Sequence, residues 1–186
     1  MHVVTLDISK SNTGWTSWDS ATQDDPVYDS ECLGSEFTLD GWVFANMHAL
    51  LTTIEEKHGK IDAIFYEDAI NILPNARNTN VHAIKLAAGL IAHVESWGFA
   101  RDVGVVHAVN MKSWRRQFFG RVSNKMTRGD LKDMSMERCR QFGWRPRNDD
   151  QSDALGILDY AASFMGIQPV WRQRETLQLP LGRARR

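Results

Sequence analysis

Short apolar runs bounded by turn-forming residues predict five strands, at residues 3–9, 15–18, 31–39, 61–67 and 103–108. The first three follow one another closely, so we expect an antiparallel meander. The last two are each reached through a helix, and a helical crossover predicts parallel pairing.

Apolar residues at helical spacing predict helices over residues 40–58, 81–97, 111–119, 128–142 and 149–165. Asp40, Asn110 and Thr127 are the expected N-terminal caps, and Gly59 and Gly98 the expected helix ends. The pattern therefore predicts an α/β protein with a mixed five-stranded sheet flanked by helices. In this plan, residues 1–166 form one domain and residues 167–186 a basic C-terminal tail.

The composition is typical of a globular protein, with 42% hydrophobic and 24% charged residues among 186. No segment approaches the ~20 consecutive apolar residues of a membrane span. The N-terminus enters a strand-like run directly, so we expect no secretory signal. Cys32 and Cys139 lack metal-type spacing, and we interpret them as reduced thiols in a cytoplasmic protein.

The net charge of −1 hides a strong asymmetry along the chain. Residues 1–70 hold 3 Lys and Arg against 13 Asp and Glu, whereas residues 112–147 hold 11 against 3. Such polarity favours one face for cations and another for polyanions. The alternative is two solvated faces of opposite sign.

Four acidic residues lie on the predicted apolar elements. Asp7 and Glu67 end two strand-like runs, and Asp150 and Asp153 open the last long helix on one of its faces. A carboxylate on a buried element needs a partner, a raised pKa or a metal ion. Each acid also has a simpler interpretation, as a turn former, an ion-pair partner or an acid favoured by the helix dipole. Asp149 competes with Asp150 for the fourth position.

Convergence of these four carboxylates would create a site for hard cations. Oxygen ligands suit Mg²⁺ or Mn²⁺. Two such ions ~3.5–4 Å apart can stabilise the attacking and leaving oxygens of a phosphodiester. The pattern thus predicts two ions per active site.

The order and spacing of these motifs resemble RuvC-type Holliday-junction resolvases, which belong to the RNase H-like superfamily. The similarity spans residues 3–165 and rests on four segments: Leu6-Asp7-Ile8-Ser9 with Thr13-Gly14, Tyr66-Glu67, His82 to Gly89, and Asp150 to Ile157. Ile8-Ser9 replaces the usual Pro-Gly pair, and Ile70 stands where many members carry an aromatic residue. Such divergence resembles phage-encoded members.

The resemblance implies an RNase H-like fold, Mg²⁺-dependent hydrolysis of branched DNA such as four-way junctions, and a homodimer. It makes Asp7, Glu67, Asp150 and Asp153 the catalytic metal ligands.

A basic stretch interleaved with aromatic residues is typical of DNA binding. The expected phosphate contacts are Lys112, Arg115, Arg116, Arg121, Lys125 and Arg128. Lys112 or Lys125 near the metals would stabilise developing phosphate charge. Trp114, Phe118 and Phe119 either stack on bases or form the core face of their helix.

Two other functions are compatible with parts of the pattern. One is a non-catalytic branched nucleic-acid-binding or assembly protein on the same fold. The other is an actin-like ATPase, but such proteins need two domains of this kind, and this chain has room for one.

Overall fold

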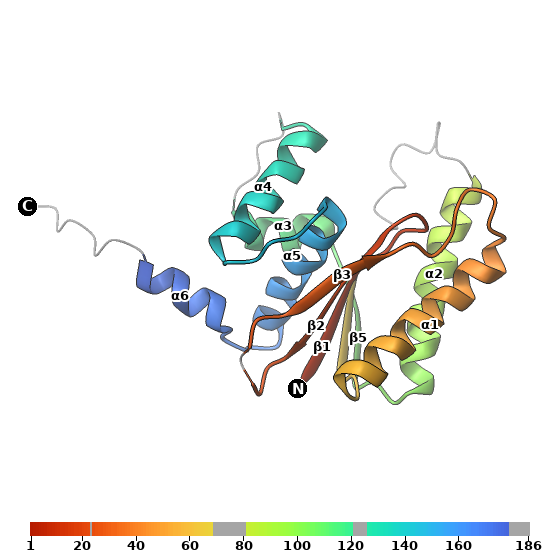
Figure 1. Cartoon of the computed structure of the whole chain (residues 1–186), viewed down its shortest axis with the longest axis horizontal. Coiled ribbons are helices and arrows are strands. Elements are labelled where there is room, and N and C mark those ends of the chain that lie inside the picture. The colour runs from red at the N-terminus through yellow and green to blue at the C-terminus, as the bar shows by residue number, and fades with distance from the viewer. Residues whose placement is uncertain (23, 69–80, 121–125, 179–186) are drawn as a thin grey trace, which may run out of the picture.

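A five-stranded sheet forms the centre of the molecule (Figure 1). The computed structural model describes residues 1–22, 24–68, 81–120 and 126–178. The strands are β1 (His2–Asp7), β2 (Thr13–Asp19), β3 (Val27–Glu31), β4 (Ala63–Glu67) and β5 (Val105–Val109). Their order across the sheet is β3-β2-β1-β4-β5.

The strand pairing confirms the predicted plan. β1, β2 and β3 pair antiparallel, while β4 pairs parallel with both β1 and β5. The parallel pairs are those in which a helix separates the strands along the chain, as the crossover rule requires.

Helices cover both faces of the sheet. On one face lie α1 (Asp40–His58) and α2 (Val81–Ala100), and on the other lie α3 (Met111–Phe119), α4 (Arg128–Gln141), α5 (Asp149–Phe164) and α6 (Val170–Gln178) (Figure 1). None of the described helices is long and apolar enough to cross a membrane.

Alternating residues along the strands divide the interior into two cores. Val4 and Leu6 pack with the side chains of α1 and α2. Val3 and Phe65 belong to the other core, with residues of α3, α4, α5 and α6. Asp7 continues the series of Val3 and Thr5, so it faces α5.

The caps follow the sequence closely at α3 and α4. The Asn110 side chain accepts a hydrogen bond from the Lys112 N–H at 2.9 Å, and Thr127 forms a capping box with Asp130. Gly59 follows α1 with φ 99°, a conformation that favours glycine. α1 differs slightly, because Leu39 is its N-cap and Asp40 its first residue.

The predicted third strand at residues 31–39 is wrong. β3 lies earlier, at Val27–Glu31, and pairs with β2 from Thr13↔Glu31 to Ser17↔Val27. After Glu31 the chain leaves the sheet, because the N–H groups of Leu33 and Gly34 both donate to Lys10 O, at 3.0 and 3.1 Å. Leu33 is then buried in the core beside α1.

Gly98 does not end its helix, which continues to Ala100. A Cβ at this position would lie 2.7 Å from Val106 Cγ2. The glycine therefore permits close packing of α2 on β5. Trp42 would share the apolar face of α1 at helical spacing, but it is 66% exposed.

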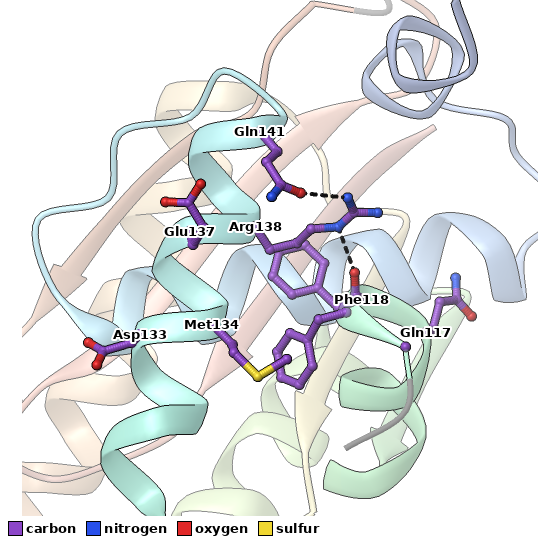
Figure 2. A pocket seen from close by; sticks show the side chains of 9 residues that line it. Gln117, Phe118, Asp133, Met134, Glu137, Arg138 and Gln141 are labelled. Atoms are coloured by element: carbon purple, nitrogen blue, oxygen red, sulfur yellow. Dashed lines mark hydrogen bonds between the residues drawn. The ribbon is translucent and has the colours of Figure 1, made fainter. Parts of the chain in front are cut away.

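A hollow of about 650 Å³ opens between the end of α3 and α4 (Figure 2). Phe118, Phe119 and Met134 supply its apolar lining, and Asp133 and Glu137 its acidic rim. Arg138 crosses it, with Nε donating to Phe118 O at 2.7 Å and Nη1 to Gln141 Oε1 at 2.9 Å.

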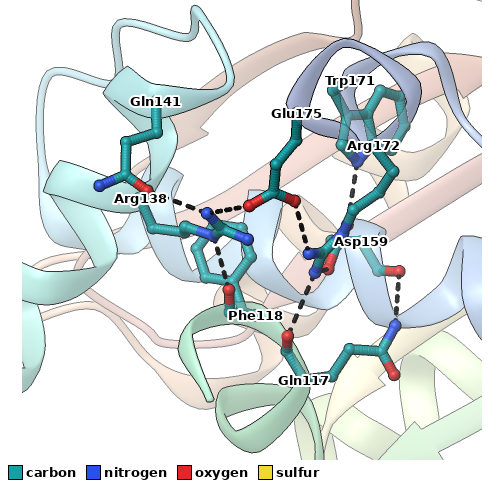
Figure 3. A network of polar contacts seen from close by, with 8 residues as sticks. All are labelled: Gln117, Phe118, Arg138, Gln141, Asp159, Trp171, Arg172 and Glu175. Carbon is teal, nitrogen blue, oxygen red and sulfur yellow. Dashed lines mark hydrogen bonds and ion pairs between the residues drawn. The ribbon is translucent and has the colours of Figure 1, made fainter. Parts of the chain in front are cut away.

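The predicted tail is partly wrong, because residues 170–178 form α6. Trp171 is 1% exposed and packs against the rings of Trp18 and Trp144. Polar contacts join the helix to three others (Figure 3). Arg172 Nε donates to buried Asp159 on α5 at 2.8 Å, Arg172 Nη2 donates to Gln117 O on α3 at 3.1 Å, and Glu175 pairs with Arg138 on α4 at 2.6 Å. The C-terminal helix is thus part of the folded domain.

Candidate active site

Two of the predicted acids lie side by side at the carboxyl ends of neighbouring strands. The parallel register pairs Leu6 with Tyr66, so the next positions are Asp7 on β1 and Glu67 on β4. Both side chains lie on the face of the sheet that α5 covers. Thr5, which shares this face with Asp7, donates a hydrogen bond from Oγ1 to Ala154 O of that helix at 2.7 Å.

The first turn of α5 brings the other two acids to this edge. Gly14, paired with Asp7 across the β1–β2 ladder, lies so close to α5 that a Cβ would be 2.0 Å from Asp150 O. Asn12 Nδ2 also donates to the Asp150 carboxylate. The turn between β1 and β2 therefore fixes the start of α5 above Asp7.

The charges of the other three carboxylates act on Asp7. Burial raises the pKa of Asp7 well above its usual range, and the charges of Asp153, Glu67 and Asp150 raise it further. Burial also raises the pKa of Glu67 and of Asp153. The structure thus brings together Asp7, Glu67, Asp150 and Asp153.

Helices α3 and α4 hold two of these acids in place. Trp114 Nε1 donates to Glu67 Oε2 at 2.7 Å. Arg115 Nη2 donates to Asp153 Oδ2 at 3.2 Å, and Ser135 Oγ donates to Asp153 Oδ1 at 2.9 Å. These donors lower the pKa of Glu67 and Asp153, but less than burial raises it.

Asp149 lies next to the cluster, because its charge is among those that raise the pKa of Asp153. It forms an ion pair with Lys132 on α4, and its pKa is lowered, with the Lys132 contacts offsetting a burial effect in the other direction. Asp150, rather than Asp149, is among the charges that raise the pKa of Asp7. Because Asp149 is already ion-paired with Lys132, whereas Asp150 is held above Asp7 by Asn12, the contacts favour Asp150 as the fourth member.

The donor set fits a hard divalent cation in its chemistry. All four groups supply carboxylate oxygens. Within the described parts of the chain, no group donates a hydrogen bond to the Asp7 carboxylate, so this partly buried acid lacks the partner that burial normally requires. As the side chains stand, no three His, Cys, Asp or Glu groups among the described residues are arranged to hold an ion. Arg115 and Ser135 already occupy the oxygens of Asp153.

Solved structures share this architecture. The Thermus thermophilus RuvC structure matches with a TM-score of 0.62 and 15% identity, covering 89% of this chain and 97% of that one. T. thermophilus RuvC in complex with a Holliday junction substrate matches at 0.63 and 14%, covering 89% and 96%.

The yeast mitochondrial Holliday junction resolvase Ydc2 matches at 0.56 and 14%, covering 95% of this chain and 80% of that one. The chain has the RNase H-like fold of RuvC. No family model and no curated protein sequence matches the chain, so this likeness is one of structure.

The predicted DNA-binding residues separate into three groups. Lys112, Arg116 and Arg128 are exposed. Arg115 instead points inward to Asp153. Arg121 and Lys125 lie outside the described residues, as does Ile70.

Acids from elsewhere neutralise part of the basic stretch. Lys132 pairs with Asp149, Arg138 with Glu175, and Arg147 with Asp29. The strong positive balance of residues 112–147 is therefore smaller on the folded surface than in the sequence.

The aromatic residues of α3 form part of the core that α3, α4, α5 and α6 share with the sheet. Trp114 and Phe118 are both 0% exposed. The interpretation as a core face is confirmed for these two residues, and base stacking is wrong for them. The hollow of Figure 2 contains none of the four acids, so we do not assign it to the chemistry.

Sequence reasoning missed three residues that contact the acids. Asn12 and Ser135 carried no pattern that marked them, and Trp114 was assigned only to stacking or packing.

Proposed function

We propose that this protein is a divalent-metal-dependent endonuclease that hydrolyses phosphodiester bonds in branched DNA and resolves four-way junctions. The observation that carries the proposal is the meeting of Asp7, Glu67, Asp150 and Asp153 at one edge of a RuvC-type sheet. Fully solvent-exposed acids would instead indicate an ordinary charged surface without a metal site. These acids are partly buried and mutually repulsive, an arrangement that is stabilised by bound cations.

Asp7, Glu67, Asp150 and Asp153 are the residues that would hold Mg²⁺ or Mn²⁺, two ions per site. Such ions supply an activated water and stabilise the charge of the departing 3′-oxygen. Asp7 is central, because it feels the charges of the other three. Trp114 and Ser135 orient Glu67 and Asp153 through the hydrogen bonds described above.

Branched DNA is the substrate class that the neighbours favour, since one RuvC structure contains a Holliday junction. In this chain the exposed cations Lys112, Arg116 and Arg128 are suited to phosphate contacts, together with Arg121 and Lys125 from the sequence. A homodimer would place two such sites on the two strands that must be cut.

A cleavage panel tests the proposal. Four-way, three-way and flap DNAs and linear duplex are incubated with the protein in Mg²⁺, Mn²⁺ or EDTA. We expect nicks in the four-way junction with either metal and none with EDTA. Tight binding of branched DNA without cleavage in any metal would contradict nuclease function and favour a binding protein on this fold.

A further inference from the structure

Helix α3 sends one positively charged side chain into the acid cluster. Arg115 lies with Nη2 3.2 Å from Asp153 Oδ2, and its side chain is only 22% exposed. Its guanidinium carbon lies 5.0 Å from the centre of the Trp114 ring. Arg115 is therefore held at the site by an acid and an aromatic face, unlike its exposed neighbour Arg116.

The Arg115 guanidinium influences three of the four acids. Trp114, on which it stacks, donates to Glu67. The positive charge of Arg115 lowers the pKa of Asp7, Glu67 and Asp153, against the larger effect of burial. Arg115 thus offsets part of the repulsion among the acids.

The same contact conflicts with metal binding. Arg115 occupies one oxygen of Asp153 and Ser135 the other. A cation that takes Asp153 as a ligand must therefore compete with Arg115. The guanidinium and a divalent ion also repel each other in a partly buried site, where screening is weak.

This inference rests on the metal-dependent nuclease function proposed above. We propose that Arg115 is the counter-cation of the acid cluster, that a divalent metal ion displaces its guanidinium from Asp153, and that the released guanidinium binds a phosphate of the DNA. The planar fork of arginine matches both a carboxylate and a phosphate. Arg115 therefore pairs with Asp153 when the metal is absent and with a DNA phosphate when the metal is bound. Its guanidinium becomes available to DNA only in the metal-bound site.

Metal affinity without DNA gives the first test. Free Mn²⁺ is measured by electron paramagnetic resonance during titration of the wild type, Arg115→Gln, Arg115→Lys and Arg101→Gln. Arg101 is a matched control, because it also pairs with an acid, Glu55, and its guanidinium carbon lies 5.6 Å from the centre of a tryptophan ring. It differs from Arg115 in lying on the side of the sheet that α2 covers.

We expect Arg115→Gln to bind Mn²⁺ roughly tenfold more tightly or better, since a competing positive charge is gone. Arg115→Lys keeps that charge and should bind as the wild type does, as should Arg101→Gln. Unchanged or weaker Mn²⁺ binding by folded Arg115→Gln overturns the displacement. If that variant melts early, stronger Mn²⁺ binding by Arg115→Lys than by the wild type overturns it instead.

Single-turnover cleavage of a four-way junction at saturating Mn²⁺ gives the second test. Arg115→Gln should cleave about 10²-fold more slowly than the wild type in spite of tighter metal binding, with partial rescue in Arg115→Lys. A purely structural arginine would lower both quantities together. Tighter metal binding with a wild-type rate overturns the phosphate contact. Failure of the wild type itself to bind Mn²⁺ overturns the nuclease proposal, and this result is distinct because it appears without any substitution.

Discussion

The contact between Gly14 and α5 gives a prediction that depends on backbone geometry. Substituting Gly14→Ala places a Cβ 2.0 Å from Asp150 O and 2.4 Å from Asp150 C. Both are backbone atoms, so a side-chain rotation cannot relieve the overlap. The first turn of α5 must move away from β2 by about 1.4 Å to reach the 3.4 Å of ordinary contact.

Such a shift is small for the fold and large for the site. Overpacking of this kind costs about 1–3 kcal/mol, which lowers the melting temperature of a chain of this size by about 2–4 °C per kcal/mol. Metal–ligand distances tolerate only about 0.2 Å, and a misplacement of about 1 Å reduces catalysis by about 10²-fold. We therefore expect a folded variant with a severe loss of cleavage.

The assay is single-turnover cleavage of a four-way junction in Mg²⁺, at a temperature well below the melting transition of the variant. Gly41→Ala is the control, because nothing lies within 4 Å of its Cβ position and it stands in the first turn of α1. That substitution should leave cleavage unchanged and stability equal or slightly higher. Wild-type melting and a wild-type rate in Gly14→Ala would refute the assigned contact between β2 and α5.

Three further predictions concern charge and packing. Because the folded state raises the pKa of Asp7, this residue stabilises the fold only at low pH and loses that contribution as the pH rises through the folded pKa. Asp7→Asn should therefore raise the melting temperature in EDTA at neutral pH. An equal gain at acidic pH would contradict this direction of the pH dependence. Trp114→Phe removes the donor that lowers the pKa of Glu67, so the acid limb of the pH–rate profile should move to higher pH, and an unmoved limb would argue against this hydrogen bond. Arg172→Ala removes the cation that pairs with buried Asp159 and leaves the Trp171 N–H on this carboxylate, so it should cost about 3–5 kcal/mol of unfolding free energy by urea titration. The exposed ion pair of Arg174 should be worth at most about 1 kcal/mol when lost, and equal losses would count against a structural role for the α6 network.

The elements that the sequence predicted well are those with a strong apolar signal. β1 and β4 are continuous apolar runs buried on both faces, and α1 has its apolar residues at helical spacing. β3 was misplaced because it is a polar strand at the edge of the sheet, where exposed and half-buried residues leave no alternating pattern.

α6 was missed for a different physical reason. Its order depends on Trp171 packing against Trp18 and Trp144, and on Arg172 meeting the buried Asp159. These partners come from β2, the α4–α5 connection and α5, so the sequence of α6 alone does not predict the contacts. Tertiary packing rather than intrinsic propensity accounts for most helix stability in proteins.

The candidate site shows the same division. The positions of Asp7 and Glu67 follow from strand ends and parallel pairing, and Asp150 and Asp153 follow from helical spacing. The groups that hold these acids do not, because the packing angles of α3 and α4 decide that Arg115 and Ser135 reach Asp153. The basic residues around Arg115 in the sequence therefore predicted an exposed phosphate contact, whereas the structure turns its side chain toward Asp153.

The role of the acid cluster is tested most directly by comparing the wild type with Asp7→Asn on one four-way junction, with binding and cleavage measured separately in Mg²⁺. Asp7 lies where the charges of the other three acids converge, and asparagine keeps its shape while removing the charge. If the four acids form the active site, both proteins bind the junction with similar affinity and only the wild type cleaves it. Cleavage by Asp7→Asn at the wild-type rate would contradict the assignment of this acid cluster as the active site.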